Sequence, residues 1–75
     1  MDNIPVEFDY KGKHYKGTLD EVSGTGGTYF LMIDKFFCGQ LFYSDHAKKW
    51  LFKSQTGEFE ELVDYFESVI ISWYG

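Results

Sequence analysis

Residues 57–73 read GEFEELVDYFESVIISW, and this stretch decides the fold because it has the clearest helical periodicity in the chain. Its apolar residues recur every three or four positions, which places them along one side of a helix. They are Phe59, Leu62, Val63, Phe66, Val69, Ile70 and Trp73. Thr56 precedes the stretch as a plausible N-cap. We therefore expect a helix over about residues 57–73, long enough to lie across a five-stranded sheet.

The residues before this helix are patterned as β-strands: the first two segments alternate between apolar and polar side chains, and the next two are apolar on both faces. Pro5 lies near the start of the first alternating segment, which suits an edge strand. Lys11-Gly12 predicts the first turn, and residues 35–39 predict another that pivots on Gly39. The expected strands cover about residues 4–10, 13–22, 29–34, 40–43 and 50–53.

The order of these elements predicts the fold class. Five strands followed by a helix are typical of an α+β domain, and short connections favour antiparallel pairing of neighbours. The 75 residues suffice for one domain, residues 1–75. We expect an antiparallel five-stranded β-meander with a C-terminal amphipathic helix packed on it. The sequence leaves open whether the sheet stays open or curls into a small barrel.

Charge and composition narrow the possible partners and location. The net charge of −5 resides entirely in residues 57–75, and the chain contains no Arg, so we expect no nucleic-acid partner. Cys38 is alone and cannot form an intramolecular disulfide, and the first residues lack a signal-peptide pattern. The apolar runs are too short to span a bilayer. These features predict a cytoplasmic protein without a membrane association.

Residue types that carry chemistry are present but are not arranged for it. The Gly-rich loop at residues 23–28 leads into a strand and matches no phosphate-binding motif. His14, His46, Cys38 and Asp45 lack metal-ligand spacing. Cys38 and His46 fall in turns expected at opposite ends of one strand, too far apart for a nucleophile–base pair. The sequence therefore predicts that the protein is not an enzyme and has no metal or cofactor.

The aromatic content of 21% exceeds what one small core can hide. Residues 29–34 are apolar on both faces, so a helix on one face would leave the other uncovered unless the sheet curls enough to bury both. This surplus leads to the first functional hypothesis, a non-enzymatic protein-interaction module, with a homodimer as one form. Its candidate contact residues are Phe30, Met32, Phe36, Phe37 and Phe42.

Two other hypotheses remain open. The outward side of the helix carries Glu60, Asp64 and Glu67 and continues to Ile71. This side is either a solvated helix face or the contact surface of an inhibitor or immunity-type protein that docks on a basic partner. The third hypothesis is a ligand-binding or enzymatic pocket between the helix and the sheet, lined by Tyr and Trp.

Overall fold

A computed structural model describes residues 3–23 and 27–75 and shows five strands followed by two helical segments. The strands are β1 (Asn3–Tyr10), β2 (Lys13–Glu21), β3 (Thr28–Ile33), β4 (Phe36–Ser44) and β5 (Lys49–Ser54), and the helical segments are η1 (Glu60–Leu62) and α1 (Val63–Tyr74). Four of the strands agree with their expected limits to within one residue at each end. Residues 24–26 of the predicted Gly-rich loop lie outside the described residues.

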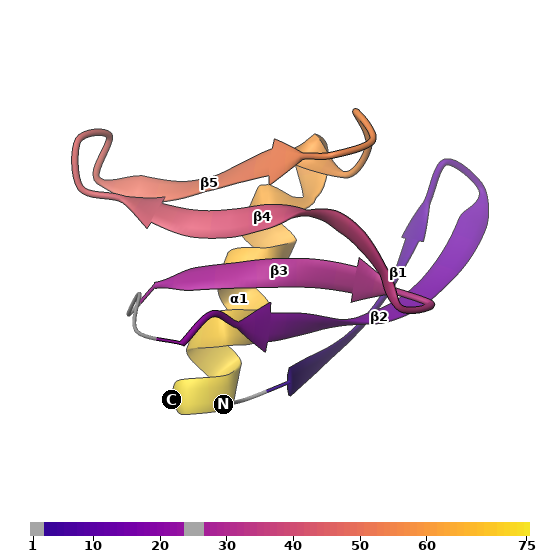
Figure 1. Cartoon of the computed structure of the whole chain (residues 1–75), viewed down its shortest axis with the longest axis horizontal. Coiled ribbons are helices and arrows are strands. Elements are labelled where there is room, and N and C mark those ends of the chain that lie inside the picture. Colours follow the sequence, from indigo (N-terminus) through magenta and orange to yellow (C-terminus); the bar gives the residue numbers. More distant parts are fainter. Residues whose placement is uncertain (1–2, 24–26) are drawn as a thin grey trace.

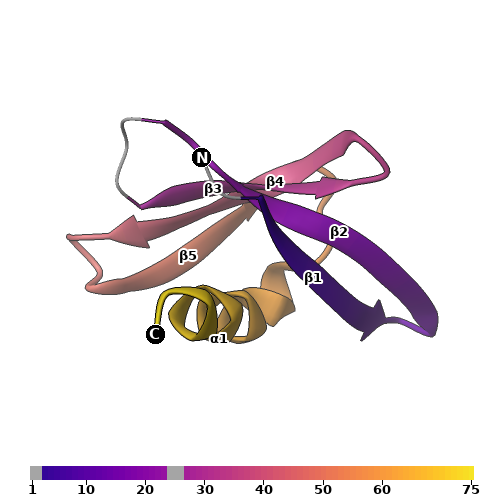
Figure 2. The ribbon, with the colours of Figure 1, turned by 90° about the horizontal axis from the view of Figure 1, so that it is seen from below.

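The strands form one meander, as expected. Each pairs antiparallel with the next, in the order β1-β2-β3-β4-β5 (Figure 1). The sheet curls into a half-barrel, and α1 lies on its concave side, in contact with the two edge strands β1 and β5 (Figure 2). The fold is therefore α+β, and the sheet is neither flat nor closed.

The β1–β2 hairpin follows directly from its sequence. Lys11 and Gly12 have φ angles of 50° and 81°, the combination that a two-residue turn needs to match the twist of the strands. The register pairs Phe8 with Tyr15 and therefore turns the apolar residues of β1 toward the helix. Pro5 lies on the edge strand of the sheet, where a missing N–H leaves no gap in a ladder.

The turn predicted at residues 35–39 is wrong. Phe36 and Phe37 belong to β4, and the turn consists of Asp34 and Lys35, both with positive φ. A β-bulge explains the difference: Leu31 pairs with Gly39 whereas Met32 pairs with Phe37, so Cys38 is the extra residue. The residues on both sides of the bulge are apolar at consecutive positions. The sequence therefore shows no alternation that would have predicted the strand there.

Gly39 is a close-packed strand residue and not the pivot of a turn. A Cβ at this position would collide with the ring of Phe52 and would lie 2.9 Å from the carbonyl oxygen of Lys53. The absent side chain thus lets β4 and β5 approach where the Phe52 ring lies across the strand.

The core lies between α1 and the concave face of the sheet. Its fully buried large side chains are Phe66, Ile4, Leu19, Leu31 and Leu41. The ring of Phe66 packs 5.6 Å from that of Phe8 and 5.3 Å from that of Phe52, so one helical residue joins the first strand to the last. Aromatic rings of this kind each bury roughly 150–250 Å².

The start of the helix differs from the prediction. Regular α-helix begins at Val63, because Phe59 adopts a left-handed conformation (φ 74°) and a short 3-10 turn follows it. The Phe59 ring is buried against the hairpin, with its centroid 4.8 Å from that of the Tyr10 ring. Burying this ring stabilises the fold more than another turn of regular helix at residues 59–62 would. Thr56 is not the N-cap; its Oγ1 accepts a hydrogen bond from the backbone N–H of Glu58.

Trp73 also departs from the predicted apolar stripe. It is 48% exposed and lines a groove with Ile4 and Pro5, at the start of the edge strand, where no described strand covers the indole.

Candidate interaction surface

The convex face of the sheet carries apolar side chains that no described element covers. The register of the strands brings them together: Met32 pairs with Phe37, and Phe42 pairs with Leu51. Paired residues of an antiparallel sheet share a face, so alternation places all of these side chains away from α1. We call this group the outer patch: Phe30, Met32, Phe37, Phe42 and Leu51.

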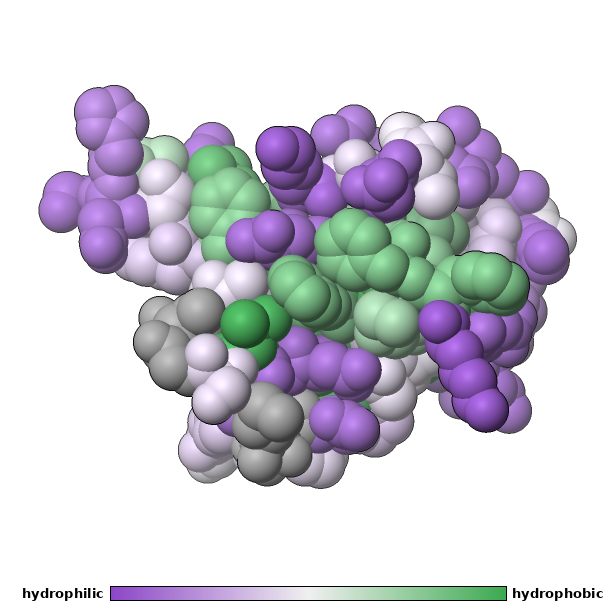
Figure 3. Space-filling model, viewed as in Figure 1, coloured by the Kyte–Doolittle hydropathy of each residue, from purple (hydrophilic) through white to green (hydrophobic). Residues whose placement is uncertain are grey.

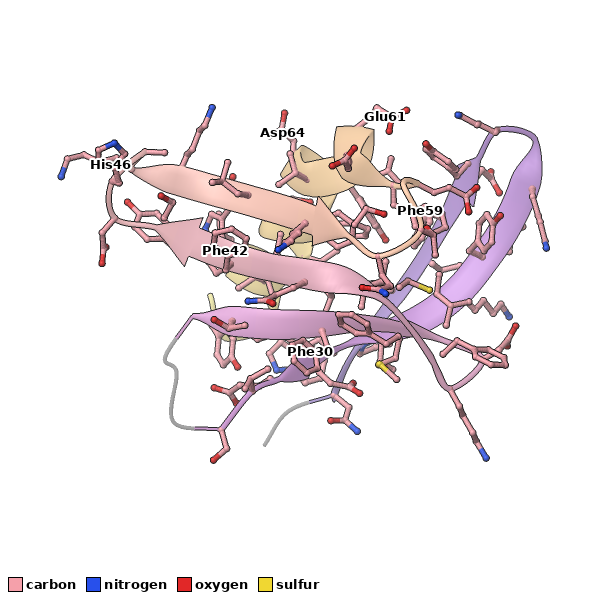
Figure 4. The ribbon with its side chains drawn as sticks, turned by 45° about the horizontal axis from the view of Figure 1, so that its top comes forward. Phe30, Phe42, His46, Phe59, Glu61 and Asp64 are labelled. Carbon is pink, nitrogen blue, oxygen red and sulfur yellow. The ribbon has the colours of Figure 1, made fainter. Side chains whose placement is uncertain are left out.

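The outer patch is partly open to solvent. Phe30 and Phe37 pack edge to face, with ring centroids 5.0 Å apart, yet they remain 36% and 39% exposed. Met32, Phe42 and Leu51 are half-buried. Figure 3 shows apolar surface gathered in two groups on this face, with hydrophilic surface between and around them, and Figure 4 shows Phe30 and Phe42 on the side away from the helix. The curl of the sheet therefore does not bury both faces.

The structure groups four of the five predicted contact residues and leaves one out. Phe36 is 73% exposed, but it pairs with Ile33 and so falls on the opposite parity, next to the β3–β4 turn. Leu51 was missed by the sequence analysis. Its position between Trp50 and Phe52 hid the alternation that assigns it to the outer face.

A hollow of about 500 Å³ adjoins the outer patch on the β2 side and shares Met32 with it. Its polar lining has both signs of charge, from Lys16, Asp20, Asp34 and Lys35. The Oδ1 atom of Asp20 is buried and has no hydrogen-bond partner among the described residues. The hollow gives the convex patch a recess in which a partner's side chain could be enclosed.

Lysines border the outer patch on the β5 side. Lys49 and Lys53 are exposed and flank Leu51 on the same face of the strand, and β5 has no acidic residue. Within the described part of the chain, neither lysine forms an ion pair. The helix-free face is thus basic at this border, although the protein as a whole is acidic.

The acidic residues predicted for a contact lie on the opposite side of the molecule. Glu60 and Asp64 are exposed, Glu67 is half-buried, and Ile71 is 59% exposed. The helix places them on the layer that faces away from the outer patch (Figure 2). The two predicted surfaces are therefore separate.

Glu61, beside that acidic stripe, is tied to the hairpin. The Tyr10 hydroxyl donates to its carboxylate, with distances of 3.0 and 3.1 Å to the two oxygens. Hydrogen bonds from its own backbone N–H and from Tyr10 lower the pKa of Glu61. This residue fastens η1 to β1.

His14 lies between two carboxylates on the β1–β2 hairpin. Its Nδ1 is 2.6 Å from an oxygen of Asp9 and its Nε2 is 2.6 Å from an oxygen of Glu7. The hydrogen bonds to Asp9 and Glu7 raise the pKa of His14. With both ring nitrogens engaged, the imidazole has no lone pair ready for a metal or for general-base chemistry.

The remaining reactive groups do not converge. Cys38 is buried, burial raises the pKa of its thiol, and its Sγ donates to the carbonyl oxygen of Phe36 at 3.6 Å. His46 lies in the β4–β5 turn, beyond the other end of β4 (Figure 4). Across residues 3–23 and 27–75, no cluster of His, Cys, Asp or Glu is grouped to hold a metal.

A second hollow, of about 470 Å³, lies between β1 and α1. It is lined by Ile4, Pro5, Ser68, Val69, Ser72 and Trp73. None of these side chains is titratable, and the Ser68 hydroxyl donates to the Tyr65 carbonyl oxygen at 2.6 Å. Of the predicted Tyr and Trp lining of a pocket between helix and sheet, only Trp73 takes part in this hollow.

Comparison with known proteins gives no relative. No protein-family model, curated protein or solved structure matches this chain. Within the ranges that the structure describes, no helix combines the length and the apolar character that crossing a bilayer requires.

Proposed function

We propose that this chain is a non-enzymatic protein-interaction module that binds its partner through the outer patch. The observation that carries the proposal is the gathering of Phe30, Met32, Phe37, Phe42 and Leu51 on the one face of the sheet that α1 leaves uncovered. Exposed apolar side chains gathered on one face of a small domain are typical of a contact site.

The composition of the patch suits this role. Aromatic residues and Met are enriched at the centres of protein interfaces, where a few side chains supply most of the binding energy. The rings of Phe30 and Phe37 already contact each other. These two side chains therefore lose little conformational entropy when a partner covers them. The hollow beside Met32 adds the recess that anchor residues usually occupy.

A second candidate function rests on a different surface. Glu60 and Asp64 are exposed next to an outward Ile71, and neither η1 nor α1 contains a basic residue. This arrangement would suit an inhibitor-like contact with a basic partner, whose affinity would fall with salt. Glu61 contributes less to it, since Tyr10 already holds its carboxylate.

The test compares matched variants in affinity capture from a lysate of the source organism, at low and high salt. Phe30→Ser/Phe37→Ser disrupts the outer patch, Asp64→Lys alters the helix surface, and Phe36→Ser is the control because Phe36 is exposed outside the patch. Thermal melts and circular dichroism verify that each variant folds.

We expect one protein to be retained at high salt by the wild type, Asp64→Lys and Phe36→Ser, and lost by Phe30→Ser/Phe37→Ser. A protein held only at low salt and lost by Asp64→Lys would instead support the second function. Retention that survives all the variants would contradict both.

A further inference from the structure

The border of the outer patch indicates what kind of partner it takes. Lys49, Leu51 and Lys53 alternate along β5, so the two lysines lie on either side of an apolar residue, with Cα atoms roughly 13 Å apart. Both are exposed and neither forms an ion pair with a described residue. An unpaired charge at the rim of an apolar contact is complementary to a partner of opposite sign.

The far border does not cancel this charge. The hollow on the β2 side has two lysines and two aspartates, so its formal charge is balanced. Four of the five acidic residues of residues 57–75 belong to η1 and α1, the helical layer on the concave side of the sheet. η1 and α1 contact β5, but they do so on the concave side of the sheet, whereas Lys49, Leu51 and Lys53 share the opposite face of that strand.

Resting on the proposed function, we infer that the partner of the outer patch is an acidic segment of another protein, in which an apolar anchor has an acidic residue on each side. The anchor packs on Phe42 and Leu51, and the flanking carboxylates reach Lys49 and Lys53. A second copy of this chain fits less well. A two-fold contact places the same surface on both sides, and each copy brings two more lysines than aspartates to it.

The test uses a random peptide library displayed on phage and selected against the intact, immobilised protein. Phe42→Ser/Leu51→Ser serves for counter-selection, because the inferred anchor packs on these two residues and peptides bound elsewhere are thereby removed. The same library is then selected against Lys49→Glu/Lys53→Glu. Sedimentation velocity of the free protein over a range of concentrations measures self-association in parallel.

We expect the retained peptides to carry Asp or Glu on both sides of an aromatic or aliphatic residue. Their affinity should fall by roughly fivefold or more with Lys49→Glu/Lys53→Glu. Selection against that variant should enrich Lys in place of the acids. Replacing the acids of one such peptide with Lys should restore its affinity for the variant, which a misfolded protein could not do.

Three outcomes overturn the inference. Peptides that need the outer patch but show no preference for acidic residues would contradict the inference that the partner is acidic. They would leave the proposed function unaffected. Self-association that Phe30→Ser/Phe37→Ser abolishes, with no peptide enriched, would make a second copy the occupant. Peptides that, before counter-selection, bind equally well to the wild type, to Phe30→Ser/Phe37→Ser and to Phe42→Ser/Leu51→Ser would contradict the proposed function itself.

Discussion

The hydroxyl of Tyr65 on α1 hydrogen-bonds both backbone groups of Glu7 on β1: it donates to the carbonyl oxygen at 2.7 Å and accepts from the N–H at 3.3 Å. β1 is an edge strand, and edge strands expose unpaired backbone groups that can template association. One side chain of the helix thus occupies the backbone position at which an added strand would begin to pair.

Tyr65→Phe should therefore weaken the domain and open this edge. We expect a loss of about 0.5–1.5 kcal/mol in the free energy of unfolding, the usual worth of a hydrogen bond. Chemical denaturation measures it, and faster amide exchange at Glu7 reports the freed edge. Tyr43→Phe, which removes the hydroxyl of an exposed tyrosine, is the control. Unchanged exchange at Glu7 would show that Tyr65 does not protect the strand.

The Tyr10–Glu61 contact should make stability depend on acid. The pKa of Glu61 is lowered from 4.5, so the ionised form stabilises the fold above that pH. This contribution is lost as the pH falls through the lowered pKa. Glu61→Gln should flatten the decline in stability over this range, measured by denaturation at several pH values. Tyr10→Phe removes the hydrogen bond from the hydroxyl but leaves the one from the Glu61 backbone N–H. The pKa of Glu61 should therefore rise only part of the way toward its ordinary value.

His14 should titrate above its ordinary value of 6.5, because both of its ring nitrogens face carboxylates. A raised pKa stabilises the fold below 6.5, and the stabilisation is lost as the pH rises through the higher folded pKa. NMR titration of the imidazole gives the midpoint. Asp9→Asn and Glu7→Gln should each lower it, with the larger effect from Asp9. A midpoint that neither variant moves would mean that the carboxylates do not hold the ring in solution.

Gly39→Ala should destabilise the β4–β5 pairing strongly. The added Cβ meets Phe52 and the Lys53 carbonyl oxygen, and overpacking of this kind costs about 1–3 kcal/mol. Gly27→Ala is the matched control, since its Cβ would lie 3.9 Å from that of Tyr43, an ordinary contact. Equal melting temperatures for the two variants would rule out the close approach.

The fold class and four strand limits followed from the sequence because β1 and β2 obey simple alternation, β3 is a short apolar run bounded by turn residues, and the helix has its own period. The start of the helix did not follow, because the burial of Phe59 against the hairpin is a contact between distant parts of the chain. The local sequence pattern shows that Phe59 is apolar. It does not indicate that the backbone adopts the left-handed conformation at Phe59 to bury the ring.

The candidate surface was predictable in part, for a similar reason. Phe30, Met32 and Phe42 fall on one parity of their strands, so alternation alone grouped them. Phe36, Phe37 and Leu51 required the bulge at Cys38 and the β4–β5 register, which assign each side chain to a face. The lysine border likewise becomes visible only when β5 is placed at the edge of the sheet.

The contacts of Phe66 with both Phe8 and Phe52 have a consequence for biosynthesis. While a ribosome is still adding α1, the emerged strands have no cover for their concave face, and the hydrophobic residues of the sheet remain available to chaperones or to other nascent chains. Such dependence on contacts between distant residues slows folding. The domain is therefore expected to acquire protease resistance in a single late step, once the residues of α1 have left the exit tunnel.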